Sequence, residues 1–480
     1  MPRVSLLVGT SGAVGLLVAL YLQRRRRHLR LQLPLDSSLA ARYGLDPCMG
    51  FILHVSQEPL QSGAQAWEAL AAALPEYNRA GSLRAAVDTL PLVHLPADFD
   101  EPQLRRARVI LGTLVHSYVH GERVPWSCLE DATGLDEQTR YVYQPAVSAL
   151  PSAPSATSVP PQLAVPWVEV SSALGLPLIL TATDVDLWNV RPLPRSVAPR
   201  DALQGVRQLV SMTGTRSERG FHSLPHAIQL ALTPTLPTLL ATPALVAAKE
   251  AAALESACDV IASALANVRA LLPSVTDLVD VDEFYDVYRL LLGGWPDDGV
   301  TMQASSDAWS EAASREGVAS EAGEGATASP AAPDGAAAED GTHEDVVAKL
   351  GGPSAGQTAV LMLVDLCVGL QHGPQLSAFQ REMSETYLPG RHRELLSSMR
   401  AQLDASGTLR DAAAAAGAPA GLIAAHARAV KELAGMRAFH MGIATNYLRK
   451  ALKGTGGSDF RALLDEGLRS TRATAVAPAR

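Results

Sequence analysis

Long stretches of helical hydrophobic periodicity constrain this chain more than any other feature of its sequence. Residues 103–120 and 422–452 carry apolar side chains at three- and four-residue spacing, which is typical of helices with one buried face. Residues 357–370 are apolar nearly all round, as in a fully buried helix. Pro243 suits the first turn of a helix, and a long Ala/Leu segment follows it to residue 272. Strand signals are few and short, for example at residues 178–180, so the sequence predicts a mainly α fold.

The composition indicates a globular protein with one unusual segment. Hydrophobic residues make up 47% and charged residues 19% of the 480-residue chain, which excludes a disordered chain and a polytopic membrane protein. Ten Asp or Glu residues and the single Arg315 lie between residues 303 and 345, so this segment carries the whole net charge of −9. The chain therefore lacks the basic excess of a nucleic-acid binder. Residues 304–341 contain almost no large apolar side chains, and we expect them to form a disordered acidic insert.

The N-terminus is predicted to be a membrane anchor. Residues 4–22 contain no charge, and at about 1.5 Å per residue a helix of this length spans about 28 Å. Residues 24–27 are all arginine and Arg30 follows, and positive charge on this side of a span keeps it in the cytosol. A cleaved signal peptide or an organelle-targeting peptide is the alternative. We expect residues 1–30 to form a single-pass anchor and the rest of the chain to face the cytosol.

Motifs of the common catalytic and metal sites are missing from the sequence. The histidines form no H-E-x-x-H motif and the cysteines form no C-x-x-C pair, so we expect neither a zinc site nor a disulfide framework. His116 and His120 have the spacing of a helical metal pair, but a helix face that meets solvent or a neighbouring loop is the simpler interpretation. His222 and His226 have the same spacing, and Pro225 between them makes a regular helix doubtful.

His440 lies on the apolar face of the helix predicted at residues 422–452. Arg437 precedes it by one turn on the same side of that helix. A lone histidine on an apolar face is more often a core residue than a ligand. A haem site, however, needs a neutral imidazole on a rigid helix, apolar walls for the porphyrin and cations for its propionates. Met436 and Phe439 are suitable walls and Arg437 is a suitable cation, so both interpretations are compatible with this segment alone.

The segment around His440 is one of four sequence segments that together indicate a protein family. Residues 437–448 read RAFHMGIATNYL, and a KGTGG segment follows at residues 453–457. Upstream, residues 352–357 read GPSAGQ, and residues 284–295 read FYDVYRLLLGGW. These motifs resemble those of the indoleamine 2,3-dioxygenase family and occur in that family's order. Each motif is weak alone, but their order and spacing identify the chain as a member of the family.

The resemblance implies a fold and a cofactor. Members of the family have a small N-terminal domain over a large all-helical domain that holds haem b. We therefore expect the anchor at residues 1–30, the small domain at residues 31–175, and the large haem domain at residues 176–480. The acidic insert at residues 304–341 would interrupt the large domain. The haem domain is expected to be monomeric.

The resemblance also implies roles for individual residues. His440 would be the iron ligand, and Arg437, Asp365 and Gly356 would support the cofactor. The residues implied to contact the substrate are Phe221, Phe284, Arg289, Ser354, Ala355 and Thr455. Arg289 would bind the substrate carboxylate, Phe284 would pack on the indole ring, and Thr455 would belong to a lid over the amino-acid end. No catalytic side chain is implied, because the haem and O₂ supply the chemistry.

The implied activity is the insertion of O₂ across the indole C2–C3 bond of L-tryptophan, which gives N-formylkynurenine in the kynurenine pathway. A non-catalytic haem protein of the same fold, for oxygen storage or gas sensing, is the alternative, and a helical scaffold without haem is the third possibility. Three positions depart from the family pattern. Ala182 replaces a pocket tyrosine of the animal members, Pro225 replaces a distal serine or histidine, and His222 replaces the second phenylalanine of a distal pair. The missing ring at Ala182 predicts weak binding of L-tryptophan or a related indole.

Overall fold

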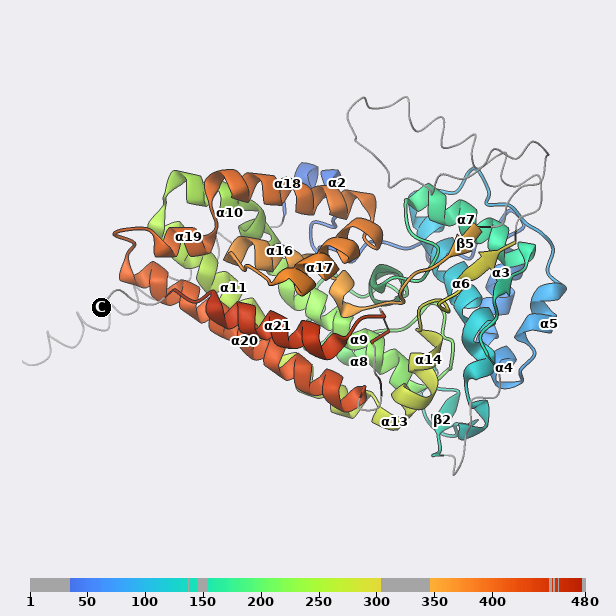
Figure 1. The fold of residues 1–480 in the computed structure, drawn as a ribbon. Coiled ribbons are helices and arrows are strands. Elements are labelled where there is room, and N and C mark those ends of the chain that lie inside the picture. Colours follow the sequence, from blue (N-terminus) through green and yellow to red (C-terminus); the bar gives the residue numbers. More distant parts are fainter. Residues whose placement is uncertain are drawn as a thin grey trace, which may run out of the picture.

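The structure is a computed structural model that describes residues 35–136, 138–145, 154–303, 346–448, 451, 454–455 and 457–476. The predicted anchor at residues 1–30 and the predicted acidic insert at residues 304–341 both lie outside these ranges. Helices make up most of the described chain, and the few strands are short (Figure 1). The mainly α fold expected from the helical periodicity is confirmed.

The helices fall into an N-terminal and a C-terminal set. The first set is α2 (Ser37–Arg42), α3 (Gln65–Ala72), α4 (Leu74–Arg79), α5 (Leu83–Asp88), α6 (Glu101–His120) and α7 (Pro161–Leu174). The second set begins with α8 (Pro199–Gly205), α9 (Arg216–Leu232), α10 (Leu236–Ala248), α11 (Ala251–Leu271), α12 (Val275–Leu278), α13 (Val281–Glu283) and α14 (Arg289–Leu291). It continues with α16 (Ala359–Val368), α17 (Pro374–Thr386), α18 (Gly390–Ser406), α19 (Leu409–Ala414), α20 (Ala420–Tyr447) and α21 (Phe460–Ala473).

Short irregular helices and two small sheets connect these elements. Two single-turn π-helices are η3 (Thr183–Trp188) and η6 (Phe284–Tyr288), and η7 (Ala355–Gln357) is a 3₁₀ turn. Strands β1 (Leu129–Asp131) and β2 (Tyr141–Tyr143) pair antiparallel. Strand β4 (Val300–Met302) lies between β3 (Ser158–Val159), which is parallel to it, and β5 (Val346–Ala348), which is antiparallel. Single-turn π-helices often occur at functional sites.

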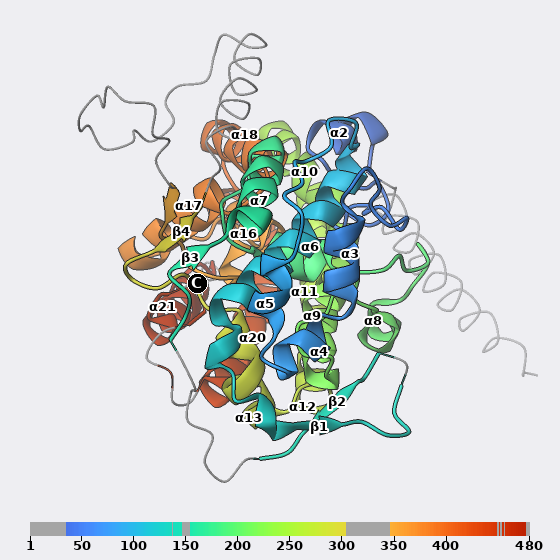
Figure 2. The same cartoon turned by 90° about the vertical axis from the view of Figure 1, so that its right-hand side faces the viewer.

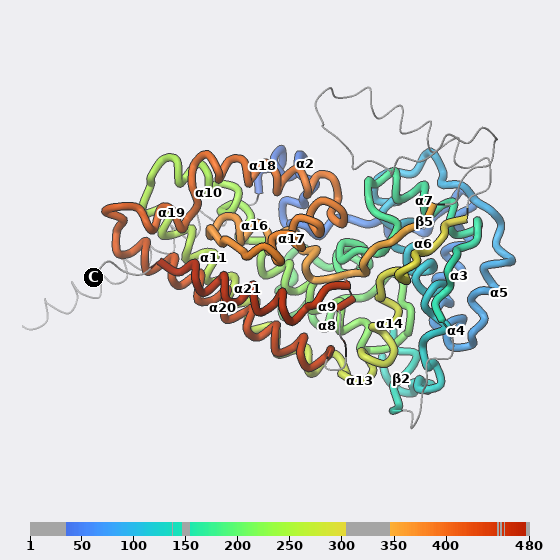
Figure 3. The backbone as a smooth tube through the Cα atoms, in the orientation of Figure 1, coloured from blue at the N-terminus to red at the C-terminus, as the bar shows by residue number. Residues whose placement is uncertain are grey.

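Helices α11, α20 and α21 form the long side of the molecule. Helix α20 packs along α11 on one side and along α21 on the other (Figure 3). Helices α3 to α7 gather at the opposite end, where α6 runs through the middle of the group (Figure 2). A buried ion pair joins this group to the rest: Arg108 of α6 and Asp184 of η3 are both fully buried, with Nε and Oδ1 3.1 Å apart.

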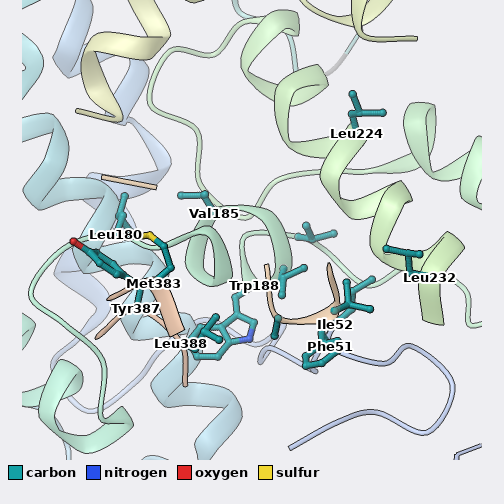
Figure 4. Packing of buried hydrophobic residues seen from close by; sticks show 14 of the residues in the cluster. Phe51, Ile52, Leu180, Val185, Trp188, Leu224, Leu232, Met383, Tyr387 and Leu388 are labelled. Atoms are coloured by element: carbon teal, nitrogen blue, oxygen red, sulfur yellow. The ribbon is translucent and has the colours of Figure 1, made fainter. Parts of the chain in front are cut away.

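One continuous set of buried apolar side chains runs through both groups of helices. Figure 4 shows a part of it where Phe51 and Ile52 lie close to Trp188, with Leu388 nearby. Helix α2 lies against α18, where Arg42 and Glu394 form an ion pair with Nη2 and Oε1 3.2 Å apart. The division into domains at residues 31–175 and 176–480 stays a prediction.

The expectations that Pro225 interrupts a helix and that Pro243 begins one were both wrong, because each proline lies within a helix that continues past it. Pro225 lies inside α9, and Pro243 lies inside α10 rather than at its start. A proline inside a helix leaves the carbonyl four residues earlier without its usual N–H donor. At Pro243 that carbonyl belongs to Leu239, and the Cys367 thiol contacts it at 3.4 Å. The helix instead ends at Lys249, which has a left-handed backbone with φ 54°.

Residues 178–180 do not form the expected strand, and His116 is not at a surface. Arg108 donates hydrogen bonds to the carbonyl of Ile179, and the Leu180 N–H donates to Nε2 of His116 at 3.0 Å. Side chains of α6 thus form hydrogen bonds with backbone groups of residues 178–180 that a neighbouring strand would otherwise bind. His116 and His120 are both fully buried. They meet neighbouring loops at Leu180 and Ser155, which is one of the two placements expected for them, and they do not meet solvent.

Two described helical stretches are long and apolar enough to cross a membrane. They are Arg216–Ala248 and Ala251–Leu278, and 56% and 44% of their most apolar 18-residue segments are buried, in that order. Both belong to the helical body described above, and the core helices of soluble proteins pass the same test.

Candidate active site

His440 lies in the last third of α20, where the helix is only partly covered. Met436 is buried one turn earlier, whereas Phe439 keeps 40% of its surface exposed, contrary to the inward position expected from the sequence. His440 itself is half-buried. Burial, with a smaller contribution from the Arg437 cation, lowers the pKa of His440. A neutral imidazole is therefore favoured, and this is the form that binds a metal.

Space remains around this part of α20. A methyl group added at Gly442 would meet no atom within 4 Å, and Ile443 is half-buried. Within the described part of the chain, no residue makes a hydrogen bond to the His440 ring. Gly442 is exposed and the His440 ring makes no hydrogen bond to a described residue, so this face of α20 is open to a bound group. One axial imidazole is enough to hold haem.

A buried polar network fixes α20 one turn before His440. Nη2 of Arg437 donates to both carboxylate oxygens of Asp365 in α16, at 2.8 and 2.6 Å. Asp365 also accepts hydrogen bonds from His372 at 3.0 Å and from Gln380 at 3.2 Å. Burial alone would raise the pKa of Asp365, but the Arg437 cation and the His372 contact outweigh it and hold this pKa below its usual value. Nη1 of Arg437 reaches Thr471 of α21, so one arginine joins three helices.

Two phenylalanines expected at the substrate site lie against each other. The rings of Phe221 in α9 and Phe284 in η6 stack with centroids 4.8 Å apart and planes 25° apart. Phe284 also meets the ring of Tyr447 edge to face at 5.8 Å. Tyr447 lies two turns after His440 on α20 and donates a hydrogen bond to the Val279 carbonyl at 2.8 Å. The aromatic pair is therefore connected to the helix that carries His440.

Arg289 follows η6 directly and is half-buried. Its guanidinium lies 5.3 Å from the centre of the Tyr285 ring. Burial lowers the pKa of Arg289 and the Tyr285 hydroxyl raises it, but an arginine keeps its positive charge in any such setting. A partly desolvated fixed cation five residues after Phe284 is suited to bind a carboxylate.

The segment from Ser354 to Gly356 is held by contacts on both sides. Oγ1 of Thr455 donates to the Pro353 carbonyl at 2.6 Å, and the Gly352 N–H donates to the Thr455 carbonyl at 3.0 Å. Ser354 Oγ accepts the Gly356 N–H at 3.2 Å. A methyl group at Gly356 would lie 2.4 Å from the Phe379 ring, so a larger residue there would have to displace that ring. Ala355 is exposed at the tip of this segment.

Ala182, which stands where the family pattern has a tyrosine, lies close to the Ser354–Gly356 segment. The Ala182 N–H donates to Oε1 of Gln357 at 2.8 Å, and Nε2 of Gln357 donates to the Gly352 carbonyl at 3.1 Å. The start of η3 is therefore fixed to the Ser354–Gly356 segment. Among the described residues, no hydrogen bond or ring contact joins His440 directly to Phe221 or Ser354; the connections pass through α20 and the loops above.

Sequence reasoning missed a buried polar chain behind the aromatic pair. Nδ1 of His222 lies 2.8 Å from Oδ1 of Asp186, and Nε2 of His222 contacts the Tyr288 hydroxyl. The spacing of His222 and His226 drew attention to this helix, but the partners lie 36 residues before and 66 residues after His222. No local pattern could connect them. Burial raises the pKa of Asp186, which His222 partly offsets, and raises that of Tyr288 well above its usual value.

The described residues contain no group of three or more His, Cys, Asp or Glu side chains that could hold a metal ion. The four cysteines are free thiols, and Cys48 is the exposed one among them.

Comparison with known proteins covers nearly the whole described chain. The profile of the indoleamine 2,3-dioxygenase family matches residues 39–451. Indoleamine 2,3-dioxygenase 1 of Rattus norvegicus is 26% identical over 414 residues, which is 86% of this chain and 85% of that protein. A 6-hydroxytryptophan 2,3-dioxygenase of Fusarium equiseti is 25% identical over 82% of this chain and 80% of its own length. A myoglobin of Haliotis diversicolor is 24% identical over 89% of this chain and 96% of its own length.

Proposed function

The chain belongs to the indoleamine 2,3-dioxygenase family, and from this premise we propose that it is a haem-dependent dioxygenase acting on L-tryptophan. The proposed reaction inserts both atoms of O₂ across the indole C2–C3 bond and gives N-formylkynurenine. Relatives named for indoleamine and for 6-hydroxytryptophan dioxygenation support an indole as the substrate class. Membership of the family indicates a dioxygenase, and turnover of L-tryptophan is the proposal.

The observation that carries the proposal is the half-buried His440 on a helix fixed by Arg437 and Asp365. Burial lowers the pKa of this histidine, which favours the neutral imidazole. When haem b is bound, its iron supplies the activation of O₂ that no side chain can provide. His440 would hold that iron, and the Arg437–Asp365 network would keep the imidazole in position. Gly356, which has no side chain, would let the backbone come close to the cofactor.

The substrate would be held at both of its ends. Arg289 would bind the carboxylate of the amino acid, and Phe284 and Phe221 would pack on the indole ring. Ser354 and Ala355 would line the opposite side. Thr455, tied to the Pro353 carbonyl, would help to close the amino-acid end and exclude water. In such a reaction the main contribution of the protein is to orient the substrate and to exclude water from it.

The second candidate function is a non-catalytic haem protein that stores or senses a gas. It is favoured by the likeness to a molluscan myoglobin over 89% of the chain. A carboxylate-binding Arg289 has no use in such a protein, and this is why we prefer the enzyme.

We further propose that residues 1–30 anchor the protein in a membrane in a single pass and that a monomeric haem domain faces the cytosol. The support is the uncharged run at residues 4–22 with the arginines behind it.

The deciding experiment uses the purified full-length protein with reductant, O₂ and L-tryptophan. The dioxygenase is expected to show a haem Soret band and to accumulate the absorbance of N-formylkynurenine. A Soret band with reversible O₂ binding and no product would favour the storage or sensing protein. Absence of the Soret band after reconstitution with haem would exclude both functions.

A further inference from the structure

His372 is a member of the buried network around Asp365 that no sequence motif marks. It lies between α16 and α17, and its side chain is only 5% exposed. Nε2 of His372 is 3.0 Å from Oδ2 of Asp365 in α16, and Nδ1 is 2.9 Å from the Ser470 hydroxyl of α21. The Ser377 hydroxyl of α17 donates to the His372 carbonyl at 3.2 Å. His372 therefore connects three helices within the network.

The partners of the two ring nitrogens fix the orientation of the His372 imidazole. A carboxylate only accepts hydrogen bonds, so Nε2 carries a proton and donates to Asp365. In the neutral imidazole Nδ1 is then an acceptor, and the Ser470 hydroxyl donates to it. The ring cannot turn without losing one of these two bonds. Its donor is thus held in a fixed position opposite the Asp365 carboxylate.

Asp365 needs a fixed donor because of the way in which Arg437 binds it. Arg437 uses one nitrogen, Nη2, for both carboxylate oxygens, at 2.8 and 2.6 Å, while its Nη1 contacts Thr471. Two parallel bonds from two guanidinium nitrogens would fix the plane of a carboxylate, whereas a single nitrogen leaves the carboxylate able to turn. His372 and Gln380 both donate to Oδ2, at 3.0 and 3.2 Å. These two bonds therefore set the orientation of the carboxylate.

The contacts form a closed ring that includes the helix of the proposed iron ligand. Two consecutive hydroxyl residues of α21 bind His372 and Arg437, and Asp365 joins the same two side chains from α16. Arg437 lies one turn before His440 on α20, and its cation is close enough to lower the pKa of that imidazole. The position of Arg437 therefore transmits a change at His372 to His440.

We propose that His372 is a positioning residue of the cofactor site, which acts through Asp365 and Arg437 to hold the His440 imidazole in one orientation toward the iron. The inference rests on the proposed function, because it takes His440 to be the iron ligand. Loss of an outer hydrogen-bond partner of a metal ligand typically lowers metal affinity by roughly 10- to 100-fold. His372 acts from further away than such a partner, so its effect belongs at the lower end of this range.

The test compares three variants of His372 in the full-length protein with its haem. His372→Leu removes the donor to Asp365. His372→Asn keeps a polar group for Ser470 but is too short to reach Asp365, whereas His372→Gln places an NH₂ donor where Nε2 was. His94→Leu is the control, because Nδ1 of His94 pairs with Glu169 of α7 at 2.7 Å, in a different part of the fold.

Two measurements report on the iron ligand without depending on turnover. The first is the rate at which haem leaves the protein for an excess of apomyoglobin. The second is the iron–imidazole stretching band in the resonance Raman spectrum of the ferrous protein. His372→Leu and His372→Asn should release haem about tenfold faster and should broaden the band, because the imidazole then takes several orientations. His372→Gln and His94→Leu should match the wild type in both measurements.

The proposal is overturned if His372→Leu and His372→Asn keep the wild-type band, even where they release haem faster, because a loss of stability alone would have that effect. It is also overturned if His372→Gln or His94→Leu broadens the band as much as His372→Leu does. If His372→Leu does not fold, the band of His372→Asn decides between these results.

Formation of N-formylkynurenine is measured separately, so that the proposed reaction and the role of His372 can fail independently. A band in the wild type that broadens in His372→Asn, without any product, would refute the proposed reaction alone. Product formation with an unchanged band in the His372 variants would refute the role of His372 alone. Absence of an iron–imidazole band from the wild type would overturn both the ligand assignment of His440 and the role of His372.

Discussion

Replacing Asp365 by asparagine should destabilise the protein far more than an equivalent change at the surface. Asparagine has the same shape, so no cavity forms, but the Arg437 cation loses its counter-ion. In the folded protein the side chains of Arg437 and Asp365 are only 16% and 6% exposed. Removing one partner of a buried ion pair costs about 3–5 kcal/mol, because the remaining charge stays buried without compensation.

The same helix offers a matched control. Arg428 of α20 pairs with Asp259 of α11 at 2.5 Å, but these side chains are 50% and 27% exposed. An exposed pair contributes about 0–1 kcal/mol, so Asp259→Asn should change the free energy of unfolding by no more than that. The double variant Asp365→Asn/Arg437→Gln should lose less stability than the sum of its single changes, because removing both charges leaves neither uncompensated.

The assay is urea unfolding followed by far-UV circular dichroism, with the haem content recorded for each variant. The folded pKa of Asp365 is lowered from its usual value of about 4. Its stabilising contribution is therefore fully present above about pH 4 and is lost as the pH falls through the folded pKa. The difference between wild type and Asp365→Asn should shrink over that acid range. The reasoning is refuted if Asp365→Asn costs no more than Asp259→Asn at neutral pH.

Four further changes have expected outcomes. His440→Ala should abolish haem retention, seen as loss of the Soret band, and a variant with full haem content and an unchanged spectrum would exclude His440 as the ligand. Arg289→Ala should raise KM for L-tryptophan by about one to two decades through loss of a charged hydrogen bond, and should leave KM for tryptamine, which has no carboxylate, nearly unchanged. Deleting residues 304–341 should leave the melting temperature and haem content nearly unchanged; a large fall would show an ordered insert. Removing residues 1–30 should move an active protein from the membrane pellet to the supernatant, and recovery only in the pellet would indicate a second membrane contact.

Several features of the candidate site could be predicted from the sequence because they depend on short-range order. Arg437 and His440 lie one turn apart on a helix whose apolar period is visible in the sequence, and such a period predicts which residues share a face. The role of Asp365 beside Arg437 was implied by the family resemblance and not by local order, and in the structure Nη2 of Arg437 contacts both carboxylate oxygens of Asp365. The C-terminal end of this helix was less predictable, since the sequence indicated residue 452 and α20 ends at Tyr447.

Only the tertiary structure determines which residues from distant segments form hydrogen bonds with one another. Pro243 fits inside a helix because Cys367, distant in sequence, contacts the carbonyl that the proline leaves free. His116 is buried because Leu180 and Leu291 supply its hydrogen bonds. Asp186, His222 and Tyr288 form one polar chain only when η3, α9 and η6 pack together. Periodicity along the sequence determines which residues form helices and which faces are apolar, whereas hydrogen bonds between distant segments depend on how those helices pack, and no local pattern records that.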